Sequence, residues 1–154
     1  MKRRAGFTLV ELMVVVAILG ILAATAIPLL NTWRQRASGS EAAATLRMIL
    51  NAEIAYYLEN ENFFPEVANP FIKIYHDGRD PSTGDIQRTK DALNISIPTG
   101  HFLDFSITNT LDPLSPSCLI VINHSNNLDL FKNGAKSIVG ELDNTGKITI
   151  LYPQ

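Results

Sequence analysis

The chain has 154 residues, which is enough for one domain of ordinary size plus an anchoring segment. Its 13 basic and 15 acidic residues give a formal net charge of −2 at pH 7, which excludes the strongly basic field typical of nucleic-acid-binding proteins. The single cysteine, Cys118, excludes an intramolecular disulfide, and its apolar neighbours indicate a buried, inert thiol.

The first predicted element is an apolar helix over residues 7–30, with Glu11 near its start. Residues 12–30 contain no charged side chain, and Lys2, Arg3 and Arg4 precede them. About 19 residues at about 1.5 Å each span about 28 Å, close to the hydrocarbon thickness of a bilayer. The segment therefore predicts a single membrane-spanning helix.

Two residues of this segment are unusual for a plain membrane anchor. A carboxylate such as that of Glu11 costs about 2.5–3.5 kcal/mol to insert into a membrane and is normally retained for a function. Pro28 lacks a backbone N–H, so we expect it to kink or locally melt the helix. Glu11 at the helix N-terminus also interacts favourably with the helix dipole, and Pro28 also suits the point where the helix leaves the membrane.

The N-terminus resembles that of a type IV prepilin or of a type II secretion pseudopilin. The similarity runs through the basic leader Met1–Gly6, the segment Phe7–Leu12 and the apolar helix to Pro28, and extends more weakly to about Pro65. A secretory signal peptide is a poor alternative, because the apolar run is too long and no Ala-x-Ala site follows it.

This resemblance implies that a prepilin peptidase cleaves after Gly6 and methylates the new amine of Phe7. Cleavage removes three of the 13 basic residues, so the formal charge moves from −2 to −5. In the assembled filament, the carboxylate of Glu11 pairs with the N-terminal amine of a neighbouring Phe7, which would satisfy an otherwise unpaired acid. Helices of related filaments loosen around a proline at the place of Pro28.

The helix is predicted to continue through residues 31–62 as an amphipathic segment. Apolar residues at helical spacing form one stripe, and charged residues occupy the opposite face. The stripe is Ala43, Leu46, Leu50, Ile54, Tyr57 and Leu58; the charged residues are Glu41, Arg47, Glu53 and Glu59. The weak helix formers Ser38–Gly39–Ser40 leave open a bend, and the helix is expected to end near residues 60–62.

A connecting region is predicted over residues 65–93. It contains a polar loop in which Asp77, Asp80 and Asp85 are weak calcium candidates, since carboxylate oxygens suit calcium but the spacing matches no EF-hand. A solvated acidic turn is the alternative interpretation. A short helix is expected over residues 86–93.

Four strands complete the predicted head, residues 63–154. They are expected over residues 102–107, 118–123, 137–142 and 147–151. Asp143-Asn144-Thr145-Gly146 joins the last two as a hairpin turn. The predicted fold class is α+β: a long N-terminal helix packed on a small antiparallel sheet, as the resemblance to type IV pilins also implies.

No catalytic or metal-binding motif is found, since His76, His101 and His124 are scattered, so we expect neither an enzyme nor a cofactor. The predicted protein is a structural type IV pilus subunit, with roles in adhesion and twitching motility implied by the resemblance. It waits in the inner membrane with its head in the periplasm, because the basic leader favours the cytoplasm. An assembly platform then adds it to a homo-oligomeric filament on the cell surface.

Three alternatives stay open at this point. The chain is also compatible with a pseudopilin of a periplasmic type II secretion filament, and the missing cysteine pair leans slightly that way. A minor pilin is the second alternative. A periplasmic binding module on an uncleaved signal anchor is the third, and it differs by tolerating Glu11→Ala.

Overall fold

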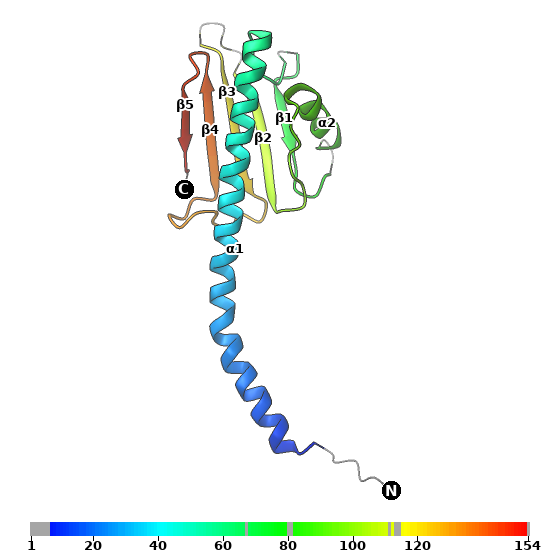
Figure 1. Ribbon diagram of the computed structural model, residues 1–154, viewed down its shortest axis with the longest axis vertical. Helices are drawn as coiled ribbons and strands as arrows, with labels where there is room; N and C mark the ends of the chain where they lie inside the picture. Colours follow the sequence, from blue (N-terminus) through cyan, green and yellow to red (C-terminus); the bar gives the residue numbers. More distant parts are fainter. Residues whose placement is uncertain (1–6, 67, 80–81, 111, 113–114, 154) are drawn as a thin grey trace. The chain divides into compact units, whose positions relative to one another are not determined.

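The computed structural model describes residues 7–153 apart from residues 67, 80, 81, 111, 113 and 114. The chain forms two compact units that meet in the sequence between Arg34 and Gln35. Helix α1 runs from Leu9 to Asn60, so its residues contribute to both units. The structure confirms the predicted α+β class and the predicted end of the long helix (Figure 1).

The second unit contains a five-stranded antiparallel sheet in which spatial order equals sequence order, β1-β2-β3-β4-β5. Each strand is therefore joined to the next by a simple reversal of the chain. The strands are β1 (Phe71–Ile74), β2 (Leu103–Thr110), β3 (Ser117–His124), β4 (Ser137–Asp143) and β5 (Ile148–Leu151). The four predicted strands are confirmed as β2 to β5, with ends shifted by up to three residues.

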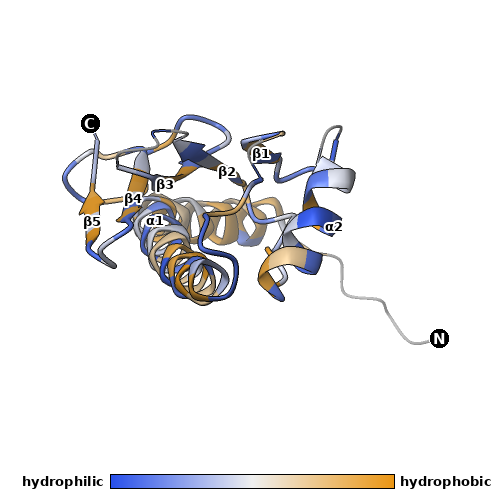
Figure 2. Cartoon of the chain, turned by 90° about the horizontal axis from the view of Figure 1, so that it is seen from above, coloured by the Kyte–Doolittle hydropathy of each residue, from blue (hydrophilic) through white to orange (hydrophobic). Residues whose placement is uncertain are grey.

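Strand β1 and the full length of helix α2 were not predicted. Strand β1 has only four residues, too few for an alternating apolar pattern to indicate a strand, and it forms by pairing with β2. Helix α2 extends over Ser82–Leu93, four residues earlier than expected. It lies beside β1, and much of it is hydrophilic (Figure 2).

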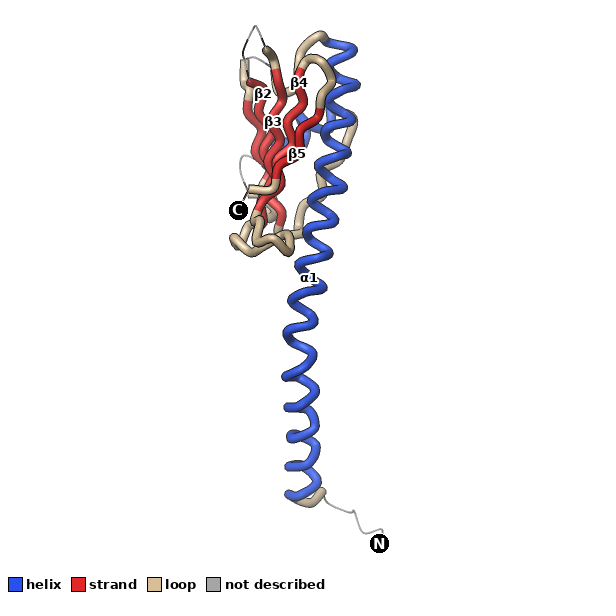
Figure 3. The backbone as a smooth tube through the Cα atoms, turned by 90° about the vertical axis from the view of Figure 1, so that its left-hand side faces the viewer, coloured by secondary structure: helices blue, strands red, loops and turns tan. Residues whose placement is uncertain are grey.

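The core lies between the sheet and residues 35–60 of α1, which cover one face of the sheet (Figure 3). Leu46, Ile49 and Leu50 of the helix are at most 1 % exposed. Strand residues point alternately toward the helix and away from it, as β2 shows by its strict alternation of buried and half-buried side chains. Gly140 of β4 allows close approach, because a Cβ there would lie 2.7 Å from Cδ1 of Leu46.

The predicted apolar stripe on α1 is partly wrong. Leu58 was expected in the core but is 77 % exposed, whereas Glu53 was expected on the polar face but is fully buried. Helical spacing itself places Glu53 on the buried face, since it follows Leu46 by seven residues and Ile49 by four. The chain after α1 then returns over this side of the helix, and the backbone N–H of Phe64 bonds the Glu53 carboxylate. Periodicity thus predicts the face on which Glu53 lies, whereas the turn that supplies its hydrogen-bond donor cannot be inferred from one helix.

Two polar side chains fasten this returning segment. Glu53 Oε2 accepts a hydrogen bond from the backbone N–H of Phe64 at 3.1 Å. The side-chain amide of Asn109, on β2, donates to the backbone oxygens of Phe63 at 2.8 Å and Pro65 at 3.0 Å. Both polar groups are buried, so the bonds hold the turn where water cannot replace them.

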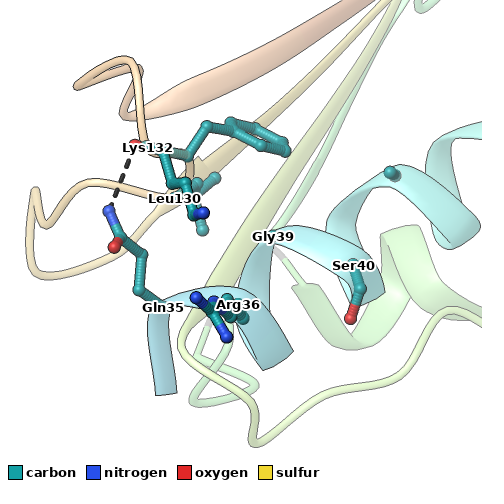
Figure 4. A pocket seen from close by; sticks show the side chains of 8 residues that line it. Gln35, Arg36, Gly39, Ser40, Leu130 and Lys132 are labelled. Carbon is teal, nitrogen blue, oxygen red and sulfur yellow. Dashed lines mark hydrogen bonds between the residues drawn. The ribbon is translucent and has the colours of Figure 1, made fainter. Parts of the chain in front are cut away.

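The Ser38–Gly39–Ser40 segment contains no break, since α1 is helical throughout it. Gly39 is buried against the loop that joins β3 and β4, and a Cβ there would overlap the carbonyl oxygen of Leu130. Close to this contact, the side-chain amide of Gln35 donates to the carbonyl oxygen of Phe131 at 3.1 Å (Figure 4). Gly39 therefore allows the helix to pack closely against this loop and does not bend the helix.

The predicted hairpin turn is confirmed. Asp143 Oδ1 accepts the backbone N–H groups of Thr145 at 2.9 Å and Lys147 at 3.0 Å, and the hydroxyl of Thr145 at 2.6 Å. Gly146 takes a φ of +80°, which side chains rarely adopt. The sequence Asp-Asn-Thr-Gly thus supplies both the side-chain acceptor and the left-handed residue that the reversal needs.

Candidate functional site

The first unit offers an apolar helix with almost nothing to cover it. Every large apolar side chain of α1 from Leu9 to Trp33 is at least 46 % exposed in the subunit. The helix is long and apolar enough to cross a membrane, and hydrophobic residues run around its turns (Figure 2). Apolar surface of this extent is unstable in water and needs lipid or other protein chains around it.

The helix begins with a reciprocal hydrogen-bond arrangement between Thr8 and Glu11. Glu11 Oε2 accepts both the backbone N–H and the hydroxyl of Thr8, each at 2.8 Å. The backbone N–H of Glu11 in turn donates to Thr8 Oγ1 at 3.3 Å. This is a capping box, which satisfies backbone donors that the first helical turn leaves without partners.

The capping box corrects the expectation that Glu11 is unpaired in the free subunit. One carboxylate oxygen is engaged by Thr8, while Oε1 has no partner among the described residues. The box involves no atom of the bond between Gly6 and Phe7, so cleavage there would leave it intact. Thr8 was not singled out from the sequence, although Thr-x-x-Glu before an apolar run is the pattern that marks such a cap.

The other predicted processing and assembly residues are placed as follows. Gly6 lies outside the described residues, and Phe7, the next residue, is 85 % exposed. Pro28 lies inside α1, and the helix is continuous through it, so the isolated subunit shows no local melting there. Loosening at Pro28 inside a filament stays a prediction.

Two of the three weak calcium candidates contact donors of the chain itself. Asp77 Oδ1 lies 3.6 Å from Nε of Arg79. Asp85 Oδ2 accepts the backbone N–H of Lys73 at 2.8 Å. Asp80 lies outside the described residues. No group of three or more acidic, histidine or cysteine side chains suited to a metal occurs in the part of the chain that the structure describes.

One buried carboxylate stands apart from the N-terminal segment. Burial raises the pKa of Glu53 to about 8, although the hydrogen bond from the Phe64 N–H acts in the opposite direction. Burial also raises the pKa of the Cys118 thiol well above its usual value, with the Glu53 charge adding to it. An unreactive thiol beside a largely protonated acid indicates a packed interior rather than a catalytic pair.

The N-terminal segment is similar to segments of known proteins. Residues 1–27 match the family model of the prokaryotic N-terminal methylation motif. The type IV major pilin PilA of Myxococcus xanthus is 44 % identical over 61 residues, which are 40 % of this chain and 28 % of PilA. The type IV major pilin PilE1 of Neisseria gonorrhoeae is 48 % identical over 61 residues, again 40 % of this chain and 28 % of the relative.

The same segment is also similar to a protein of a secretion system. The type II secretion system core protein G of Aeromonas hydrophila is 39 % identical over 62 residues, which are 40 % of this chain and 43 % of that protein. The chain thus spans less than half the length of these relatives, and the similarity is confined to about 60 residues. No solved structure matches the chain.

Proposed function

We propose that this chain, whose N-terminal segment belongs to the type IV pilin and pseudopilin family, is a structural subunit of a type IV pilus filament. The observation that carries the proposal is the uncovered apolar part of α1 together with the partly engaged carboxylate at its start. Lipid tails can cover the apolar surface but carry no cation that could pair with Glu11. The same segment of neighbouring subunits can do both, so the role is structural rather than enzymatic.

Before assembly, the apolar helix holds the subunit in the inner membrane. Lys2, Arg3 and Arg4 keep the leader on the cytoplasmic side by the positive-inside rule, and the head then faces the periplasm. A prepilin peptidase cleaves after Gly6 and methylates the amine of Phe7. The exposed position of Phe7 at the helix start is compatible with both reactions.

During assembly, the amine of Phe7 from one subunit pairs with Glu11 of its neighbour. The capping box orients the carboxylate, because Thr8 holds Oε2 and leaves Oε1 for the incoming amine. A preoriented acceptor loses less conformational freedom on pairing than a mobile side chain does. The pair supplies register, and burial of apolar surface between helices supplies most of the stabilisation.

A pseudopilin of a type II secretion system is the second candidate, favoured by the likeness to core protein G. The two candidates share the leader, the apolar helix and the Glu11 pairing. They differ in where the filament lies: on the cell surface for a pilus, and in the periplasm for a pseudopilus.

The test separates the charge of Glu11 from its capping role. Glu11→Gln keeps an oxygen for the Thr8 donors but removes the negative charge, whereas Thr8→Val removes the capping hydroxyl and keeps the charge. We expect both variants to be cleaved after Gly6, which the mass of the N-terminal peptide reports. Filament yield should fall at least about tenfold for Glu11→Gln and only a few-fold for Thr8→Val, since a charge-assisted pair is worth more than one neutral cap.

Normal filament yield from cleaved Glu11→Gln would contradict the pairing with the Phe7 amine. Equal losses for the two variants would show that Glu11 acts through the cap alone.

A further inference from the structure

A polar hollow of about 430 Å³ lies on the head, at the end of the sheet where β2 and β4 begin and β3 ends. Asp104, Asn123 and Ser137 line it from three neighbouring strands, since Asp104 is paired with Asn123 and Asn123 with Ser137. Leu103 and Phe105 on either side of Asp104 are buried in the core. Because side chains alternate along a strand, Asp104 points to the sheet face opposite α1 (Figure 3).

Asp104 presents one fixed, unused acceptor to this hollow. Its Oδ1 accepts the backbone N–H of His76 at 2.9 Å and lies 3.0 Å from Nδ1 of the same residue. These contacts fix the carboxylate, and Oδ2 has no partner among the described residues. The side chain as a whole is 17 % exposed.

The neighbouring side chains are polar as well. Asn123 and Lys136 line the hollow with exposed side chains and Ser137 with a half-buried one, so these groups are open to a ligand from solvent. Ser125 lines it too, and its hydroxyl is buried without a partner in the described part of the chain. Buried polar groups are nearly always satisfied, so the unpaired Ser125 hydroxyl beside the hollow points to a ligand.

His124 also lines the hollow, and its ring can donate one hydrogen bond. Its Nδ1 accepts the backbone N–H of Asn126 at 3.2 Å, so a neutral ring carries its proton on Nε2. Burial lowers the pKa of His124, and the charge of His76 acts in the same direction against the opposing effect of Asp104. The ring is therefore neutral at pH 7.

Phe102 places an exposed aromatic ring beside the same residues. Its ring stacks on that of His124 with centroids 6.2 Å apart and planes 3° apart, and it is 53 % exposed. Its φ of +58° is rare for a bulky side chain and costs conformational energy. Strain of this kind, together with exposure of an aromatic ring, is concentrated at binding sites.

We propose that this hollow binds a neutral saccharide. Oδ2 of Asp104 accepts hydrogen bonds, Lys136 and His124 donate them, and the amide of Asn123 does both. A sugar hydroxyl also does both, so it can satisfy either kind of group. A phosphate or sulfate would be repelled by Asp104, and an ammonium ligand by Lys136. The proposal does not depend on filament assembly, since all the residues belong to one subunit.

The test uses the full chain in a detergent without a sugar headgroup, applied to an array of neutral, sialylated and sulfated oligosaccharides. Titration with the best neutral oligosaccharide then gives an affinity for the native chain and for Asn123→Ala and Lys136→Ala. Both residues are exposed, so the head should fold normally. Lys90→Ala, at an exposed position of α2, is the matched control.

We expect at least one neutral oligosaccharide to bind, with affinity about tenfold weaker for each of the two variants and unchanged for Lys90→Ala. Binding of none, or of acidic oligosaccharides alone, would overturn the proposal. Equal affinity of Asn123→Ala, Lys136→Ala and the native chain would overturn it as well.

Discussion

Glu53 gives the head a pH-dependent stability that a single isosteric substitution should remove. The acid is fully buried on α1, one oxygen accepts the Phe64 N–H, and the other has no partner among the described residues. Burial raises its pKa from 4.5 to about 8. The folded head therefore binds a proton that the unfolded chain releases at lower pH.

The sign follows from this difference in proton binding. Between pH 4.5 and about 8 the folded state holds more protons than the unfolded state, so stability falls as pH rises through that window. Below pH 4.5 the stabilisation that protonated Glu53 provides is fully present, and well above pH 8 it is lost completely. At about 1.4 kcal/mol per pKa unit, this one group should cost the head about 4 kcal/mol between pH 5 and pH 9.

Glu53→Gln keeps the shape and an acceptor for the Phe64 N–H but cannot ionise. We expect the free energy of unfolding of the variant to lack this decline, so that it exceeds that of the native head increasingly as pH rises. Any constant cost of burying the extra amide hydrogens cancels when the two pH profiles are compared. Glu59→Gln, on the exposed part of the same helix, should follow the native profile and is the control.

Hydrogen exchange of the β2 and β3 amides in the full chain, held in detergent, measures these free energies at each pH without requiring the apolar helix to unfold. Parallel pH profiles for the native chain and Glu53→Gln would refute the reasoning. That result would mean that water reaches Glu53 or that the turn moves away from it.

Three further substitutions test the packing of the head, each by urea unfolding of the full chain in detergent. Gly39→Ala should destabilise by about 2–3 kcal/mol, because its methyl group would overlap the backbone oxygen of Leu130, which cannot move alone; an unchanged midpoint would contradict the close contact. Gly140→Ala should cost less, about 1 kcal/mol, since it meets the flexible end of Leu46; a larger cost than at Gly39 would reverse our ranking. Asn109→Ala should cost about 3 kcal/mol by leaving two buried carbonyl oxygens unpaired; a cost near zero would mean that water replaces the amide.

The parts of the fold that the sequence predicts are those with local causes. The uncharged run over residues 12–30 predicts a membrane-length helix because length and hydrophobicity suffice for that inference. The Asp143–Gly146 turn is predictable because its side-chain acceptor and left-handed residue lie within four positions. The alternation Leu103, Phe105, Ile107 marks β2 for the same reason.

The parts that escape prediction depend on distant segments. Helical spacing places Glu53 on the face of Leu46 and Ile49, but its hydrogen-bond donor comes from a turn that the chain forms 11 residues later. Gly39 is required by a loop about 90 residues away. The hollow next to Asp104 combines three strands and a loop, and no spacing rule joins their polar residues. At the candidate assembly site, Glu11 was found from its cost in the membrane, while its partner Thr8 was overlooked even though the signal was local.

The most direct test of the central claim is mass spectrometry of the N-terminal peptide, comparing sheared extracellular filaments with the membrane fraction. A filament subunit of a type IV pilus should appear in the sheared material as a chain that starts at methylated Phe7. The same processed peptide found only in membranes would favour a pseudopilin or a minor subunit. An intact Met1, or cleavage at any bond other than Gly6–Phe7, would contradict the account.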